Sequence, residues 1–99
     1  MTNVTLGLDG ENFVLKVEGH SGHGAAGNDI VCAGISVLAQ SFAQYCVDSP
    51  NCTVKALCIR EGYLSISVSG KCKEALDMTI IGIRNLTENY PENIKFSIC

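Results

Sequence analysis

Residues 63–69 read Tyr-Leu-Ser-Ile-Ser-Val-Ser, and this stretch defines the architecture of the chain. Its apolar residues alternate strictly with serines, which is typical of a strand with one buried face and one face in water. The pair Glu61-Gly62 just before it predicts a turn, so the stretch forms the second arm of a hairpin. The first arm of this hairpin is predicted over residues 53–59.

Another hairpin is predicted at the start of the chain. Apolar and other residues alternate on both sides of the turn Asp9-Gly10. The alternating apolar positions are Val4, Leu6, Leu8, Phe13, Leu15 and Val17. The same alternation over residues 94–98 predicts a last strand.

One helix is predicted after each hairpin. The first runs from Asp29 to about Cys46, with apolar residues on nearly all sides, and Asn28 or Asp29 is expected as its N-cap. The second follows Gly70 and ends before Pro91. The predicted buried stripes are Val31, Ile35, Leu38, Phe42 and Tyr45 in the first helix, and Cys72, Leu76, Thr79, Ile83, Leu86 and Tyr90 in the second.

The predicted order of elements is therefore ββα-ββα-β. Two helices packed on one face of a small mixed β-sheet would bury both stripes, so we predict an α+β fold. A chain of 99 residues has room for one hydrophobic core. We therefore expect a single domain over residues 1–99.

The composition excludes several classes of protein. Apolar residues make up 46% and charged residues 17%, as in packed globular domains. The net charge of −3 argues against direct binding to nucleic acid. No uninterrupted apolar run approaches the roughly 18 residues of a membrane span, and the first residues do not resemble a signal peptide. We therefore expect a cytoplasmic protein, with no membrane partner, whose six cysteines are free thiols.

The glycine-rich segment Gly19–Asn28 joins the first hairpin to the first helix, beside two reactive residues. Cys32 is predicted as the third helical residue, where unpaired backbone N–H groups favour a thiolate. His20 is anchored by the preceding strand and can act first as a base and then as an acid. With N–H donors for an oxyanion, these groups meet the requirements of acyl transfer.

Each of these residues also has an ordinary interpretation. A free cysteine is often a small buried hydrophobe, and His20 can be a turn residue. His23 is the rival base, although no strand anchors it. Asp29 is expected as an N-cap that could also orient His20. Ser36, one turn beyond Cys32, either bonds back to the preceding turn or forms a polar wall of the site.

The other cysteines offer no recognisable metal site. The sequence contains no Cys-x-x-Cys pair, so neither a metal nor a cofactor is expected. We predict packing or incidental roles for Cys46, Cys52, Cys58, Cys72 and Cys99.

The motif Val17-Glu18-Gly19-His20, with Asp29-Ile30-Val31-Cys32-Ala33 after the glycine-rich spacer and Ser36 beyond it, resembles the ribosomal-processing cysteine protease family called Prp. The ββα-ββα outline and the length are also similar over essentially the whole chain. Two features depart from the family pattern. Ser21 and His23 replace a small apolar residue and an aromatic one, and Gly34 replaces an alanine, which lowers helix propensity by up to about 1 kcal/mol.

The resemblance implies a cytosolic, homodimeric endopeptidase with Cys32 as nucleophile and His20 as base. Asp29 and Ser36 would be supporting polar residues. The substrate would be the N-terminal extension of a large-subunit ribosomal protein (the twenty-seventh), removed after an aromatic-rich motif before ribosome assembly. A loop would close over the bound peptide, and it would contain Gly19, Ser21, Gly22, His23, Gly24 and Gly27.

Two other functions fit parts of the sequence. A dimeric, non-enzymatic binding module would use the glycine-rich loop and the helix N-terminus to hold an anion or a peptide. A thiol redox protein is disfavoured because no resolving cysteine lies close to Cys32 in the sequence. Fast alkylation of Cys32 at mildly acidic pH would distinguish the protease from the binding module.

Overall fold

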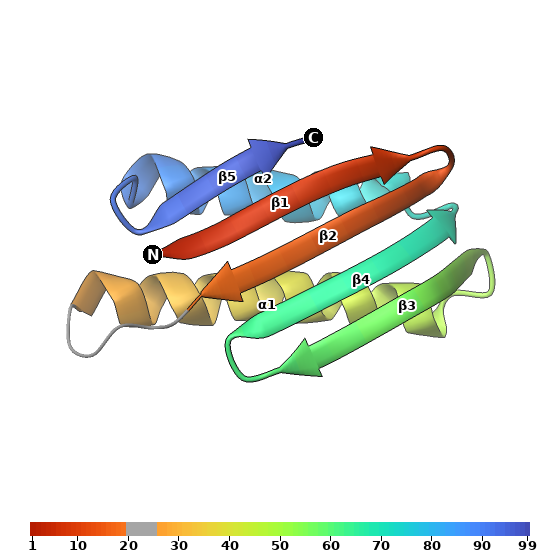
Figure 1. The fold of residues 1–99 in the computed structure, drawn as a ribbon, viewed down its shortest axis with the longest axis horizontal. Helices are drawn as coiled ribbons and strands as arrows, with labels where there is room; N and C mark the ends of the chain where they lie inside the picture. The colour runs from red at the N-terminus through yellow and green to blue at the C-terminus, as the bar shows by residue number, and fades with distance from the viewer. Residues whose placement is uncertain (20–25) are drawn as a thin grey trace.

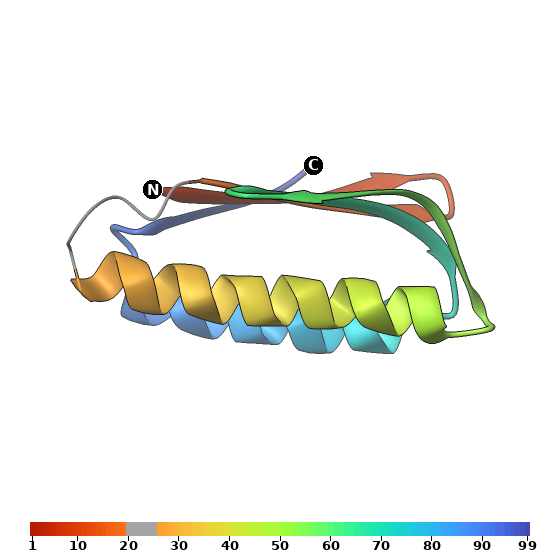
Figure 2. The same ribbon diagram turned by 90° about the horizontal axis from the view of Figure 1, so that it is seen from below.

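The computed structural model describes residues 1–19 and 26–99. They form two layers, with a five-stranded sheet in one and two helices in the other, as predicted (Figure 1). The elements are β1 (Thr2–Asp9), β2 (Asn12–Gly19), α1 (Ala26–Asp48), β3 (Cys52–Arg60), β4 (Tyr63–Gly70), α2 (Lys73–Asn89) and β5 (Ile94–Ile98). Figure 2 shows both helices on the same face of the sheet.

The sheet has the strand order β3-β4-β2-β1-β5. The two hairpins are joined through the antiparallel pair β2 and β4, and β5 adds parallel to β1 at one edge. This mixed pairing confirms the predicted sheet. It also brings the N-terminus, the end of β2 and the β3–β4 turn to the end of the molecule where α1 begins (Figure 1).

The core lies between the two layers, and the alternation in β4 accounts for it. Leu64, Ile66 and Val68 are buried under the helices, whereas the serines between them are only half-buried on the other face. Leu15 of β2 pairs with Ile66 and is also completely buried. Because each strand buries every second side chain, the sequence pattern predicted the inward face correctly.

The helices run antiparallel (Figure 1), and they approach each other closely at two glycines. A Cβ added to Gly34 would lie 2.9 Å from Leu86 Cδ1, and one added to Gly82 would lie 2.7 Å from Leu38 Cδ2. Each helix therefore presents a leucine to a glycine of the other. This contact explains why Gly34 stands at a position where the family resemblance led us to expect alanine.

The start of α1 differs from the prediction. The helix begins at Ala26 rather than Asp29, so Asn28 and Asp29 lie inside its first turn and are not its N-cap. Asparagine and aspartate favour caps, but they cost less than 1 kcal/mol each inside a helix, and packing of the whole helix outweighs that cost. As a consequence, Cys32 is the seventh helical residue and not the third.

The buried stripe of α1 also differs in part from the prediction. Val31, Ile35 and Phe42 are buried as expected, but Tyr45 is 47% exposed, and the buried side of the helix instead includes Ala39, Ala43 and Cys46. In α2 the predicted stripe is confirmed at Leu76, Thr79 and Ile83, and Ile80 joins it. The prediction that Tyr45 is buried was wrong because α1 is apolar on its outer face as well, so the sequence pattern does not distinguish the two faces.

The outer apolar side chains give α1 an unusual hydropathy. Its segment Ile30–Asp48 has a mean hydropathy of 1.6 and is long enough to cross a membrane, although polar residues interrupt its apolar runs. The core helix of a globular protein meets the same test of length and composition. Here the helix packs on the sheet through one face and leaves Val37 and Val47 exposed on the other.

Candidate active site

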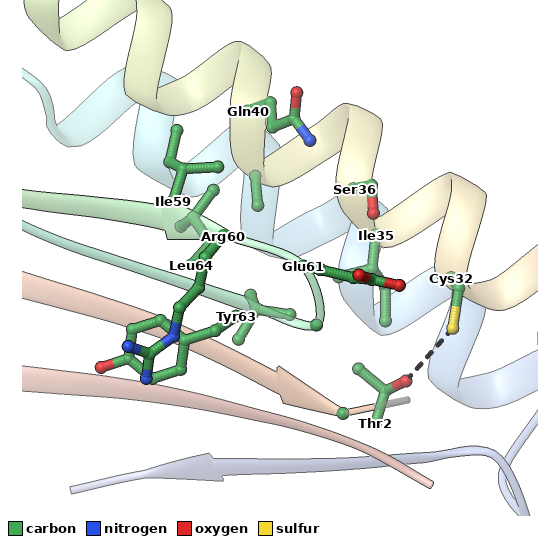
Figure 3. A pocket seen from close by; sticks show the side chains of 14 residues that line it. Thr2, Cys32, Ile35, Ser36, Gln40, Ile59, Arg60, Glu61, Tyr63 and Leu64 are labelled. Atoms are coloured by element: carbon green, nitrogen blue, oxygen red, sulfur yellow. Dashed lines mark hydrogen bonds between the residues drawn. The ribbon is translucent and has the colours of Figure 1, made fainter. Parts of the chain in front are cut away.

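Cys32 lies in the wall of a cleft of about 270 Å³ at the end of the sheet (Figure 3). One wall is α1, the opposite wall is the β3–β4 turn, and the ends of β1 and β2 form the floor. The lining residues are Thr2, Val17, Gly19, Cys32, Ile35, Ser36, Ala39, Gln40, Ile59, Arg60, Glu61, Gly62, Tyr63 and Leu64. Chain segments far apart in sequence therefore meet around one sulfur.

The sulfur of Cys32 has one identified polar neighbour, the hydroxyl of Thr2. Cys32 Sγ and Thr2 Oγ1 are 3.7 Å apart, and either atom can be the hydrogen-bond donor (Figure 3). Thr2 is only 5% exposed, and its backbone N–H donates to the carbonyl of Asn93 at 2.8 Å. The hydroxyl is thus held firmly beside a half-buried sulfur that opens into the cleft.

The position of Cys32 along α1 changes the electrostatic argument made from the sequence. The unpaired N–H groups belong to the first four helical residues, and the helix dipole acts mainly within the first turn. Cys32 is beyond that turn, although helical side chains lean back toward the N-terminus. The helix N-terminus alone therefore stabilises a thiolate at Cys32 less than predicted. The Thr2 hydroxyl is the closest identified group that could stabilise one.

Gly19 forms the junction between the sheet and the cleft. It pairs with Thr2 across β1 and β2, and its N–H donates to the carbonyl of Gly62 at 3.0 Å. A Cβ at Gly19 would lie 2.7 Å from the carbonyl oxygen of Met1 and 2.8 Å from Thr2 Cα. Glycine at this position allows the close approach that places Thr2 against the sulfur.

The remaining walls combine polar and apolar groups. Ser36 lies one turn beyond Cys32 and lines the same cleft. Glu61 extends from the β3–β4 turn toward α1 and lines the same cleft (Figure 3). The turn itself is stabilised by the Arg60 guanidinium, which stacks 4.4 Å from the centre of the Tyr63 ring.

Only some of the predicted site residues fall within the described structure. His20, Ser21, Gly22, His23 and Gly24 lie outside the described residues. Of the predicted substrate-covering loop, Gly19 instead ends β2 and Gly27 lies in the first turn of α1, so neither belongs to a loop. Asp29 lies in that same first turn.

Sequence reasoning missed Thr2, Gln40 and the β3–β4 turn. Thr2 precedes Cys32 by 30 residues, and only the pairing of β1 with β2 and β5 brings it to the cleft. No local motif marks such a contact. The turn at Glu61-Gly62 was recognised, but its position opposite α1 depends on the strand order.

For the peptidase activity that the family resemblance implies, we expect Thr2→Val to lower kcat/KM about 10–100-fold, because a hydrogen bond to a charged sulfur is worth roughly 1.5–3 kcal/mol. Valine keeps the shape of threonine and removes only the hydroxyl. The measurement is kcat/KM together with the pH profile of Cys32 alkylation by iodoacetamide. If Thr2 only fills space, the pH profile of the variant will match that of the unmodified protein.

Comparisons with known proteins agree with this geometry. A family model described as cysteine protease Prp matches residues 1–95. A comparison with curated protein sequences finds no match. Several solved structures share the fold, among them the following three.

The first is an essential ribosomal processing protease Prp from S. aureus in complex with a substrate peptide, with a TM-score of 0.83, 21% identity and full coverage of both chains. The second is the same protease with a covalently linked product peptide, with a TM-score of 0.80, 22% identity and full coverage of both chains. The third, from Streptococcus mutans, has a TM-score of 0.75 and 26% identity over 99% of this chain and 93% of the other. Since the family model spans nearly the whole chain, this protein belongs to the Prp family of cysteine proteases.

Proposed function

We propose that this protein removes the N-terminal extension of a large-subunit ribosomal protein, the twenty-seventh, with Cys32 as nucleophile and His20 as general base and acid. The observation that carries the proposal is the half-buried sulfur of Cys32 in the wall of an open cleft. Membership in a cysteine protease family supports peptide cleavage over a non-enzymatic binding module. The substrate is supported by the related S. aureus enzyme, which is named a ribosomal processing protease.

The proposed mechanism is acyl transfer through a thioester. His20 takes the proton of Cys32, and the thiolate attacks the carbonyl carbon of the scissile bond. The imidazolium then protonates the leaving amine, and a water molecule activated by the same histidine hydrolyses the thioester. The Thr2 hydroxyl supports this series of reaction steps because it can hold the sulfur of Cys32 in one orientation.

The lining of the cleft fits a substrate with an aromatic side chain beside the cleaved bond. Val17, Ile35, Ile59 and Leu64 provide apolar surface within the same cavity as the sulfur. Gly19, the residue before His20, also lines this cavity, so the chain enters the histidine segment at the edge of the cleft. Ser36 is proposed as a polar wall, and Asp29 as a residue that orients His20.

The direct test is incubation of the purified precursor of that ribosomal protein with this protein, followed by mass analysis of the products. We expect one cut that releases the N-terminal extension, next to an aromatic residue. If the precursor stays intact under conditions in which Cys32 is reduced, the ribosomal protein is not the substrate. Cleavage of an unrelated aromatic-rich peptide at the same rate would contradict the specificity.

The choice between the two histidines is tested by single substitutions. His20→Ala is expected to lower kcat about 10²–10⁴-fold, which is the usual contribution of general acid–base catalysis. His23→Ala should retain activity within a few-fold and serves as the matched control. If His23→Ala is inactive while His20→Ala cleaves normally, His23 is the base.

We propose further that the protein is a cytoplasmic homodimer that associates through the outer face of its helices. Val37, Tyr45, Met78 and Ile81 are exposed on this face, where they line a groove of about 710 Å³ between α1 and α2. An apolar surface of this kind on a small domain is typical of an interface, and a two-fold axis would cover it with its own copy.

Analytical ultracentrifugation at micromolar concentration distinguishes a dimer interface on the helix face from one on the sheet edge. Ile81→Lys is expected to shift the protein to monomer, because it places a charge in the groove. Leu57→Lys is the control, since Leu57 is an exposed apolar residue of the edge strand β3. A dimer that survives Ile81→Lys but is lost in Leu57→Lys would place the interface on β3.

A further inference from the structure

Three cysteine sulfurs meet at the end of the molecule opposite to the cleft. Cys46 lies in the last turn of α1, Cys52 is the first residue of β3, and Cys72 immediately precedes α2. Their Sγ atoms all lie within 4.8 Å of one another. Among the residues that the structure describes, no other three His, Cys, Asp or Glu side chains come this close. No sequence motif predicts this cluster, since the three residues are 6 and 20 positions apart.

The backbone around the cluster is held by several contacts. Cys52 pairs with Gly70 across β3 and β4, two residues before Cys72. The N–H of Lys71 donates to the carbonyl of Asn51 at 3.0 Å, and the N–H of Cys52 donates to the carbonyl of Ser49 at 3.3 Å. These bonds fix the segments that carry Cys52 and Cys72 beside each other. The short link after α1 brings Cys46 to the same place.

The cluster is closed on one side and accessible on the other. Cys46 and Cys72 are each 1% exposed, whereas Cys52 is half-buried and lies at the rim. Burial, and then the neighbouring sulfurs, raise the pKa of the Cys46 thiol to about 12. Burial also raises the pKa of Cys72. Burial of Cys46 and Cys72 therefore disfavours bare thiolates there, and a bound cation would neutralise their charge.

We propose that Cys46, Cys52 and Cys72 form a binding site for a thiophilic d¹⁰ metal ion such as Zn²⁺. The ion replaces the three S–H protons, forms three metal–sulfur bonds and releases three protons, and no electrons are transferred. Because no two of the sulfurs are more than 4.8 Å apart, a central point lies at most about 2.8 Å from each, against about 2.3 Å for a zinc–thiolate bond. A contraction of at most about half an ångström per sulfur therefore completes the site.

The open side at Cys52 determines the coordination. Zinc is usually four-coordinate, and three protein ligands leave one position for water. Thiolates favour Zn²⁺ and other soft ions over Mg²⁺ or Ca²⁺, which prefer oxygen. Because binding releases protons, the affinity is expected to rise steeply with pH.

The experiment isolates the cluster from the other three cysteines. In the variant Cys32→Ala/Cys58→Ser/Cys99→Ser, kept reduced with a phosphine, Cd²⁺ is titrated as a spectroscopic probe and Zn²⁺ is added as competitor. We expect thiolate-to-cadmium absorption that saturates at one ion per chain, the release of three protons, and displacement by Zn²⁺. Adding Cys52→Ser should weaken metal binding about 100-fold or more. Even the loss of a group that only hydrogen-bonds to a metal ligand lowers metal affinity about 10–100-fold.

Two outcomes would overturn the proposal. One is the absence of cadmium–thiolate absorption at one equivalent, and the other is equal affinity with and without Cys52. Cys52→Ala repeats the comparison, so that misfolding of one variant does not decide the result. As a second measurement, Zn²⁺ should raise the melting temperature of the background variant but leave that of the Cys52 variants unchanged.

Discussion

We expect Cys32→Ala, which removes the proposed nucleophile, to lower kcat for peptide cleavage roughly 10⁴-fold or more. No other cysteine among the described residues lines the cleft, so none can replace its sulfur. The free energy of unfolding should change little, because Cys32 is only half-buried and alanine suits a helix. The measurement is kcat/KM on the precursor peptide, followed by mass analysis.

The matched control for this prediction is Cys58→Ala. Cys58 is an exposed thiol on the edge strand β3 and is not part of the cleft lining. The Cys58→Ala variant should cleave the peptide at the normal rate. Cleavage by Cys32→Ala at a rate close to that of Cys58→Ala would show that Cys32 is not the nucleophile.

Gly70→Ala, at the last residue of β4, should destabilise the fold more than alanine at any other described glycine with a positive φ, by roughly 3 kcal/mol or more. Gly70 has a φ of +103°, which residues with a Cβ rarely adopt. A Cβ there would also collide with the carbonyl oxygen of Asn51 and lie 3.1 Å from Cys52 Cα. Since both neighbours are backbone atoms, relief requires β3 and β4 to separate.

Gly10→Ala is the control that separates the two effects. Gly10 has a φ of +63° in the β1–β2 turn, but a Cβ there meets nothing within 4 Å. Its substitution should cost only the conformational strain of about 1–2 kcal/mol. Urea denaturation of both variants gives the two free energies of unfolding. Equal losses would mean that the contact with Asn51 adds nothing.

The sequence predicted the strands of this fold well because their burial repeats every second residue. In β4 the apolar positions 64, 66 and 68 are all buried, and the strand bounds differ by one residue from those expected. Helix α1 was harder, since it is apolar on two faces. Its pattern could not distinguish the buried Phe42 from the exposed Tyr45.

The candidate site was predictable only where its residues are neighbours in the chain. Cys32 and Ser36 are one helical turn apart, and both line the cleft. Thr2 and Glu61 come from distant strands and could be placed only once the strand order was known. The same reason explains why Cys46, Cys52 and Cys72 looked unrelated in the sequence.

The reciprocal contacts between α1 and α2 restrict how the sequence of this domain can diverge. Leu86 fills the space that a side chain at position 34 would occupy, and Leu38 does the same at position 82. An alanine at either glycine must displace leucine methyl groups unless the facing residue becomes smaller at the same time. Homologues that carry alanine at position 34 are therefore expected to carry a shorter side chain at position 86, so that the two sites co-vary while the spacing of the helices is preserved.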